Sequence, residues 1–196
     1  VALAIELFTE GSLNTFAKPT NVDTNSRILC YDIRDLGKQL LPVGMLVVLD
    51  SVFNRIIRNR RLGRSTWVYI DEIYLLFQHE YSANFLFTLW KRVRKYGACC
   101  TGLTQNVDDL LQSHTARTML ANSEFLVMLN QASTDRAELA RLLNISDNQL
   151  SYITNVDFGR GLIKCGSAIV PFMDHFPKNN LYRLMSTKPS EADAAV

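Results

Sequence analysis

The chain has 196 residues, 47% hydrophobic and 20% charged, so it is long enough for one domain with a continuous core and too apolar to be intrinsically disordered. Its net charge of +2 is too small to indicate nucleic-acid binding by itself, and no apolar run approaches the length of a membrane span. The sequence begins without an initiator Met and without the basic region and cleavage site of a signal peptide, which predicts a fragment of a longer protein.

The first elements predicted along the chain are a short helix over residues 2–8, a polar loop and a strand over residues 27–33. Apolar residues then recur at helical spacing over residues 41–59, which predicts an amphipathic helix. A basic cluster follows at its end and in the next loop, made of Arg55, Arg58, Arg60, Arg61 and Arg64. Such a cluster suits a solvated helix end or a DNA-binding patch, and we favour the helix end because the helix dipole attracts cations there.

The next feature is the apolar run of residues 67–70, which ends abruptly in Asp71 and Glu72. Four large apolar residues in a row predict a strand buried on both faces, with the two carboxylates just beyond its carboxyl end. Ligands of open α/β sheets bind at that edge. An Asp–Glu pair there suits a nucleotide hydrolase, in which the first carboxylate holds Mg²⁺ through water and the second polarises the attacking water. This is the Walker B pattern; the alternative is a solvated acidic turn.

The second half of the chain alternates helices and strands in the same way. We predict a helix over residues 82–96 that ends at Gly97, strands over 98–104 and 124–130, and a helix over 135–144. Ser146 and Gln149 form a capping box, and residues 161–165 and 168–172 form a hairpin. The pattern predicts an α/β fold with a mostly parallel sheet, flanking helices and an antiparallel hairpin at one edge.

This arrangement is a RecA-like layout without its beginning. Residues 1–185 are therefore expected to form the C-terminal part of a RecA-like ATPase domain. The polar, Ala-rich tail over residues 186–196 is expected to be disordered.

Gln105 follows the predicted strand that comes after the Asp71–Glu72 pair. An amide at the carboxyl end of the neighbouring strand can reach a γ-phosphate or its attacking water, which favours a sensor role. The alternative is a residue that only begins the following helix. A zinc site is not indicated, because the three histidines are scattered and the four cysteines form no C-x-x-C pair. We expect the cysteines to be small buried hydrophobic residues.

Together these motifs resemble the conjugation ATPases of type IV secretion systems, within the FtsK/HerA group of RecA-like motors. The resemblance extends over residues 14–176 and is carried by residues 16–23, 68–72, 90–97, 102–106 and 157–162. It implies an ATPase that energises substrate transfer or pilus assembly. It also implies ATP and Mg²⁺, a hexameric homo-oligomeric ring, other secretion-channel subunits and a DNA or protein substrate, at the cytoplasmic, inner face of the bacterial cell membrane.

For individual residues, the resemblance implies Asp71 for Mg²⁺, Glu72 for water activation and Gln105 as the γ-phosphate sensor. In ring motors a neighbouring subunit commonly inserts an arginine at the γ-phosphate. The candidates here are Arg92, Arg94 and Arg160. Arg160 lies between two glycines on a predicted loop, whereas the other two lie at a helix end and could equally face solvent.

The sequence departs from the family in one respect, because the phosphate loop G-x-x-x-x-G-K-[ST] does not occur in it. Its single Gly-Lys pair, Gly37-Lys38, is followed by Gln39, and Asp32 stands where the first Gly should be. We therefore expect the C-terminal portion of a longer ATPase that is inactive alone, rather than an ATPase that has lost nucleotide binding. The alternatives are a DNA translocase of the same superfamily and a non-catalytic docking module.

Overall fold

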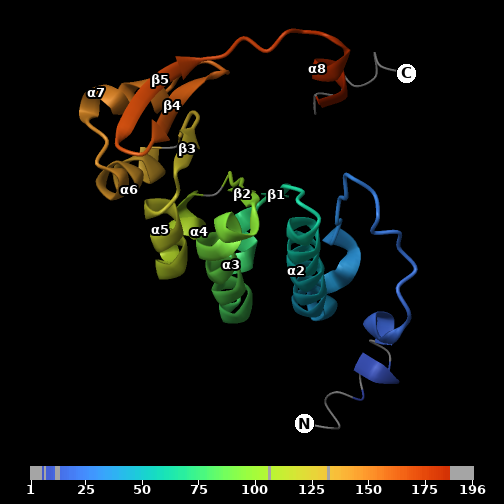
Figure 1. Ribbon diagram of the computed structural model, residues 1–196. Helices are drawn as coiled ribbons and strands as arrows, with labels where there is room; N and C mark the ends of the chain where they lie inside the picture. The colour runs from blue at the N-terminus through green and yellow to red at the C-terminus, as the bar shows by residue number, and fades with distance from the viewer. Residues whose placement is uncertain (1–5, 7, 12–13, 106, 132, 186–196) are drawn as a thin grey trace. The chain divides into compact units, whose positions relative to one another are not determined.

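A computed structural model describes residues 6, 8–11, 14–105, 107–131 and 133–185 (Figure 1). The chain divides into two compact units, Val1–Asn106 and Val107–Val196. Most of the predicted helix over residues 2–8 and the whole predicted tail over residues 186–196 lie outside the described residues. The α/β class predicted from the sequence is confirmed, since helices and strands alternate in both units.

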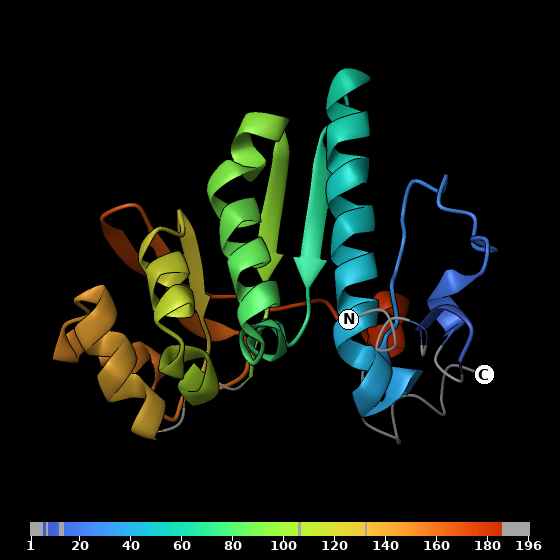
Figure 2. The same ribbon diagram turned by 90° about the horizontal axis from the view of Figure 1, so that it is seen from below.

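The first unit is built on two parallel strands and two long helices. Its elements are η1 (Asn14–Ala17), η2 (Arg34–Leu36), α2 (Gly37–Arg61), β1 (Thr66–Ile70), η3 (Ile73–Phe77), α3 (Glu80–Arg92), η4 (Val93–Tyr96) and β2 (Ala98–Gly102). Strands β1 and β2 pair in register from Thr66↔Ala98 to Ile70↔Gly102, and α2 and α3 lie on the same side of this pair (Figure 2). A buried cluster of Ile56, Leu89, Val93 and Ala98 joins the helices to β2.

The structure corrects the predicted burial of β1. Trp67 and Tyr69 are 65% and 67% exposed, whereas Val68 between them packs against the buried cluster. The expectation of a strand buried on both faces is therefore wrong for this chain. The reason is that both long helices of the unit lie on one face of β1, while alternate side chains of a strand point to opposite faces.

Residues 27–33 form no strand, contrary to the prediction. Ile28 is 79% exposed, and the hydroxyl of Tyr31 hydrogen-bonds that of Ser51 on α2 at 2.9 Å. β-Propensity alone does not make a strand, because its backbone groups need a partner strand to satisfy them. No described strand pairs with this segment, which runs as irregular chain beside α2.

Two arginines of the basic cluster, Arg55 and Arg60, bind backbone carbonyl groups of neighbouring segments. The Arg55 guanidinium donates to the carbonyl of Thr24 and, at 2.6 Å, to that of Ser26. Arg60 donates to the Lys95 carbonyl, and its guanidinium lies 5.4 Å from the centre of the Tyr96 ring. These bonds give the half-buried Arg55 a structural role that the interpretation as a solvated helix end did not include, whereas Arg60 stays exposed at the end of α2.

The statement that no apolar run approaches the length of a membrane span needs a correction for helix α2. Between Gln39 and Arg61 it is long and apolar enough to cross a bilayer by length and composition. Of the 18-residue stretch that meets this test, 22% is buried, and the inner face of the helix carries Ile56, which is fully buried in the cluster with Leu89 and Ala98. The prediction missed this candidate because polar residues interrupt the apolar run.

The second unit contains an antiparallel sheet covered on one face by helices. Its elements are α4 (Val107–Gln112), α5 (His114–Ala121), β3 (Phe125–Met128), α6 (Ser133–Leu143), α7 (Asp147–Leu150), η5 (Ser151–Ile153), β4 (Arg160–Cys165), β5 (Ala168–Met173) and α8 (Asn180–Met185). The predicted hairpin is confirmed as β4–β5, and the capping box of Ser146 and Gln149 is present. Strand β3 pairs antiparallel with β4, so parallel pairing among the described strands is confined to β1 and β2.

One face of this sheet packs on the helices. Met128 and Leu162 on the strands form a buried cluster with Leu139 and Leu143 of α6. Helix α5 was not predicted, and a helix after Gln105 was named only in the alternative role of that residue, although Val107, Leu110 and Leu111 have helical spacing in the sequence. Helices α4 and α5 contact each other and α6.

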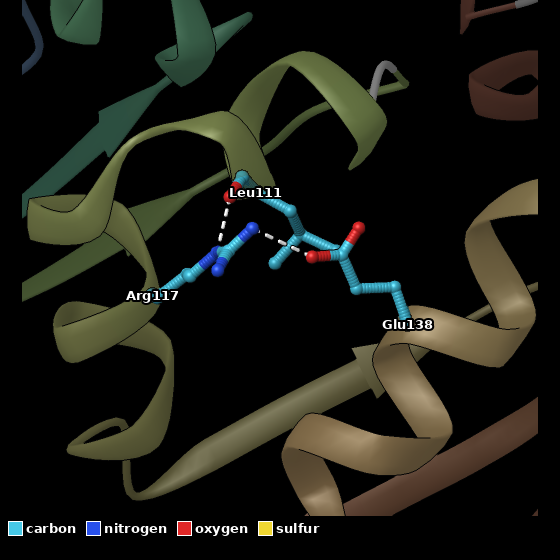
Figure 3. A network of polar contacts seen from close by, with 3 residues as sticks. All are labelled: Leu111, Arg117 and Glu138. Carbon is cyan, nitrogen blue, oxygen red and sulfur yellow. Dashed lines mark hydrogen bonds and ion pairs between the residues drawn. The ribbon is translucent and has the colours of Figure 1, made fainter.

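Arg117 ties the three helices α4, α5 and α6 together (Figure 3). Its Nε donates to the Leu111 carbonyl near the end of α4, and its terminal nitrogen binds a carboxylate oxygen of Glu138 on α6 at 2.7 Å. The Arg117 and Glu138 side chains are 44% and 30% exposed, so solvent weakens the ion pair. The hydrogen bond to the Leu111 carbonyl is therefore the stronger contribution to stability.

We expect Arg117→Ala to lower the free energy of unfolding by about 1–2 kcal/mol, because Leu111 loses a charged donor. Glu138→Gln removes only the exposed ion pair and should cost less than about 1 kcal/mol. Urea unfolding of the chain followed by circular dichroism measures both values, with Arg141→Ala on the exposed face of α6 as control. Equal costs for Arg117→Ala and Arg141→Ala would show that the network contributes nothing.

Candidate active site

The predicted carboxylate pair forms a tight turn directly after β1. Glu72 has a left-handed backbone, with φ 47° and ψ 49°, and its N–H donates to Oδ1 of Asp71 at 3.1 Å. This conformation is costly for a residue other than Gly and is found mainly where the surrounding structure holds it in place. Asp71 is therefore more than a candidate metal ligand, since it also fixes the backbone that carries Glu72.

The same turn is braced against the end of β2. The Leu103 N–H donates to the Ile70 carbonyl at 2.8 Å, and the Ile73 N–H donates to the Leu103 carbonyl at 2.9 Å. Gly102 allows this close approach, because a Cβ placed on it would lie 2.5 Å from Cδ1 of Ile73. Sequence reasoning did not identify Gly102 or Leu103 as part of the site. A Gly inside a strand does signal a close backbone approach, and that signal could have found the brace.

The Glu72 carboxylate and the Gln105 backbone meet at this edge. The Gln105 N–H donates to Oε2 of Glu72 at 3.5 Å, across the carboxyl ends of β1 and β2. Asp71 and Gln105 are exposed and Glu72 is half-buried, so all three are open to a ligand from solution. The structure thus brings together three of the predicted site residues at the sheet edge where α/β proteins bind ligands.

Arg92 and Arg94 lie at the opposite end of the unit. Arg92 ends α3, Arg94 lies in η4, and η4 leads through Gly97 into the amino end of β2. Strand β2 has five residues, a length of about 16 Å, so it separates both arginines from Glu72 of the same copy. Both side chains are exposed. Neither arginine can therefore act on the Glu72 edge of its own chain.

Arg160 belongs to the second unit and begins β4. Its guanidinium lies 3.7 Å from Oδ2 of Asp157, and the two side chains are 48% and 84% exposed. Arg160 is therefore the first residue of a strand rather than part of the predicted loop, and this exposed ion pair leaves its side chain open to solvent. The role of Arg160 in catalysis stays a prediction.

The donors at the edge suit Mg²⁺ in the presence of a nucleotide. The part of the chain that the structure describes contains no group of three or more His, Cys, Asp and Glu side chains able to hold a metal ion. Mg²⁺ does not need one, because it is usually bound by one or two carboxylates together with substrate phosphates and water. Asp71 and Glu72 supply carboxylates of this kind, so the residues present fit the ion as part of a Mg–ATP complex.

The cysteines differ from the prediction. Cys30, Cys99 and Cys165 are exposed, and Cys100 is half-buried. Burial, with a smaller contribution from the neighbouring Cys99, raises the pKa of the Cys100 thiol to about 12. Cys100 therefore stays protonated at neutral pH and is a poor nucleophile.

We expect Gly102→Ala to lower the free energy of unfolding by about 1–3 kcal/mol, because the added methyl group meets Cδ1 of Ile73 and pushes on the turn that carries Glu72. Ile73→Val removes that carbon and alone should cost about 0.5–1.5 kcal/mol. The double variant should therefore be more stable than the sum of the two single costs predicts. Urea unfolding measures the three variants, and additive costs would contradict the close contact.

Paired parallel strands with an Asp–Glu turn at their carboxyl ends are typical of the ligand-binding edge of an α/β sheet of the RecA-like class. The chain belongs to the TraG P-loop domain family, whose sequence model matches residues 18–160. The structure is also similar to that of VirB4 from Thermoanaerobacter pseudethanolicus, with a TM-score of 0.76 and 26% sequence identity. The similarity covers 90% of this chain and 49% of that one. No curated protein sequence matches the chain.

These findings confirm the predicted resemblance to the ATPases of conjugation and type IV secretion, and the predicted α/β RecA-like fold. The chain spans about half the length of the VirB4 structure that it matches. This chain contains the turn of Asp71 and Glu72 and the Gln105 backbone N–H that contacts Glu72.

Proposed function

We propose that this chain supplies the catalytic edge of an ATP-driven motor in a conjugation or type IV secretion system. The hydrogen bond that joins Glu72 to Gln105 across the ends of β1 and β2 carries the proposal. It brings a carboxylate able to polarise water next to the backbone of a residue able to sense a γ-phosphate. Membership of the TraG P-loop domain family supports the same conclusion.

In the proposed site, Asp71 would hold Mg²⁺ through water, and the bound ion would supply positive charge against the phosphates. Glu72 orients the attacking water and accepts its proton. The Asp71 side chain holds the left-handed backbone of Glu72, and the Gln105 N–H contacts the carboxylate, so the turn directs Glu72 to the edge before the nucleotide arrives. The Gln105 side chain contacts the γ-phosphate or the water.

The nucleotide needs more than this edge. The backbone N–H groups and Lys of a G-x-x-x-x-G-K-[ST] loop form the usual phosphate cradle, and this sequence has no such loop. We propose that the chain is the C-terminal part of a longer ATPase and that ATP binds tightly only when the phosphate loop is present. The present chain alone is then inactive.

The proposed motor is a homo-oligomeric ring, hexameric in the form that the family resemblance implies. It works with other secretion-channel subunits at the cytoplasmic face of the bacterial membrane, and it transfers a DNA or protein substrate or assembles a pilus. Arg92 and Arg94 lie at the end of the unit opposite to the Glu72 edge, so either could act as the catalytic arginine only on a neighbouring copy. Arg160 is the third candidate for that role.

Titration calorimetry with Mg–ATP tests whether tight nucleotide binding needs the phosphate loop. The chain alone should show no measurable affinity at millimolar nucleotide, because most phosphate contacts are absent. The complete product of the gene that encodes this chain should bind Mg–ATP. Tight binding by the chain alone, or none by the complete gene product, would contradict the proposal.

A further inference from the structure

Helix α2 carries a polar stripe that faces the irregular segment of residues 24–31. Its side chains recur at intervals of three and four residues, so they lie on one side of the helix: Ser51, Asn54, Arg55 and Arg58. The Arg55 guanidinium holds one part of the segment through the carbonyls of Thr24 and Ser26. The hydroxyl groups of Tyr31 and Ser51, 2.9 Å apart, hold another. The segment is therefore fixed to the polar stripe at two places.

A cavity of about 240 Å³ remains between the polar stripe and this segment. It is lined by Thr24, Tyr31, Ser51, Asn54, Arg55 and Arg58. Pockets for drug-sized ligands have volumes of roughly 300–1,000 Å³, so this cavity suits a smaller ligand. Among the described residues that line it, two carry a positive charge and none carries a carboxylate. The cavity therefore favours a small anion.

The two guanidinium groups at the cavity have unused hydrogen-bond donors. Arg55 binds two backbone carbonyls, and Arg58 donates to Oδ1 of Asn25 at 3.4 Å. A guanidinium has more N–H donors than these contacts use. Within the described part of the chain, neither group forms an ion pair. The Asp50 carboxylate on the same helix accepts the Asn54 amide at 2.8 Å instead. Positive charge and donors are thus available to a ligand.

We propose that this cavity binds phosphate, either as the free ion or as the terminal phosphate group of a small molecule. The planar guanidinium matches the spacing of phosphate oxygens and can bind two of them at once. The hydroxyl groups of Tyr31 and Ser51 can donate to the same oxygens. The site shares no residue with the edge of Asp71, Glu72 and Gln105, so the inference does not depend on the proposed ATPase activity.

The backbone of a nucleic acid is the alternative ligand for arginines of this cluster. A nucleic-acid strand carries a row of phosphates and is bound by cations spread along its path. Arg55 and Arg58 instead line one cavity, whereas Arg61 and Arg64 are exposed outside it. Arg60 is engaged by the Lys95 carbonyl. The convergence of two arginines on one small cavity favours a single phosphate group.

Chemical protection of arginines in the complete gene product tests the site without any substitution. Phenylglyoxal modifies accessible guanidinium groups, and mass spectrometry reports the modification at each position. Saturation with Mg–AMP-PNP first keeps phosphate out of the nucleotide site. Inorganic phosphate should then cause a loss of modification at Arg58, while Arg61, exposed on the same helix, reacts as before. Absence of protection at Arg58, or equal protection at both positions, would overturn the proposal.

Titration calorimetry with inorganic phosphate under the same conditions measures the affinity. We expect Arg58→Ala to raise the dissociation constant by about tenfold or more, because a hydrogen bond between charged groups is lost. Arg58→Lys keeps the charge but not the planar fork, so its effect should be smaller. Arg61→Ala is the matched control and should leave the dissociation constant unchanged. Absence of saturable binding, or equal effects of Arg58→Ala and Arg61→Ala, would overturn the site.

Two further probes identify the source of the phosphate group. Tighter binding of inorganic phosphate than of glycerol 3-phosphate would assign the free ion, and the reverse order would assign the terminal phosphate of a small molecule. Both results support the site. A single-stranded oligonucleotide that protects Arg58, Arg61 and Arg64 together, while inorganic phosphate protects none of them, would overturn the proposal in favour of a nucleic-acid path.

Discussion

Glu72→Gln in the complete gene product is expected to lower ATP turnover by about 10²- to 10⁴-fold, the usual contribution of a general base. The change keeps the size of the side chain and an oxygen that can accept the Gln105 N–H, but it removes the charge that orients and deprotonates water. Mg–ATP affinity should stay within about twofold, since an interaction made mainly in the transition state is lost. Steady-state phosphate release and calorimetry measure the two quantities.

Glu80→Gln is the matched control for this prediction. Glu80 begins α3 and is exposed, so the same chemical change is made in the same unit away from the edge of β1 and β2. Its turnover should equal that of the wild type. A Glu72→Gln protein with wild-type turnover would remove Glu72 from the catalytic site.

The second large effect is expected at Arg160. If Arg160 acts on the nucleotide of a neighbouring subunit, Arg160→Ala should lower turnover by about 10³- to 10⁵-fold, the range known for arginine fingers. Arg160→Ala subunits mixed with Glu72→Gln subunits should then recover part of the activity. Recovery arises because an intact Glu72 site on one subunit can meet an intact Arg160 from the next.

Arg92→Ala and Arg94→Ala are the comparison variants in this mixing experiment. Both residues are too far from their own Glu72 edge to act within one copy. If the Arg92→Ala or the Arg94→Ala variant also loses activity, mixing it with Glu72→Gln subunits should restore part of that activity. Mixed assemblies are verified first by mass spectrometry of isotope-labelled subunits. A fully active Arg160→Ala protein would exclude Arg160, and inactive variants that show no recovery in verified mixed assemblies would exclude action between subunits.

The sequence predicted the candidate edge well because its determinants are local. An apolar run that stops at Asp71 and Glu72 indicates a strand and its end, and a parallel neighbour places Gln105 at the same edge. The hairpin of β4 and β5 and the capping box at Ser146 were likewise encoded in short stretches of sequence. Such short sequence signals do not depend on tertiary contacts with distant parts of the chain.

The errors concern properties that depend on distant parts of the chain. Burial of Trp67 depends on which faces of the sheet are covered, and a strand over residues 27–33 depends on a partner strand. The role of Arg55 depends on a loop some thirty residues earlier in the chain, whose carbonyls it binds. Charge clustering indicated a helix end, whereas the tertiary contacts give the arginine a structural role.

Phosphate release by the wild-type complete gene product tests the central claim most directly. At saturating ATP, the account predicts steady release that requires Mg²⁺, stops when EDTA is added and falls by at least about 10²-fold in Asp71→Asn. A protein that binds ATP by calorimetry but releases no phosphate above background, or releases it equally well with Asn at position 71, would contradict the account.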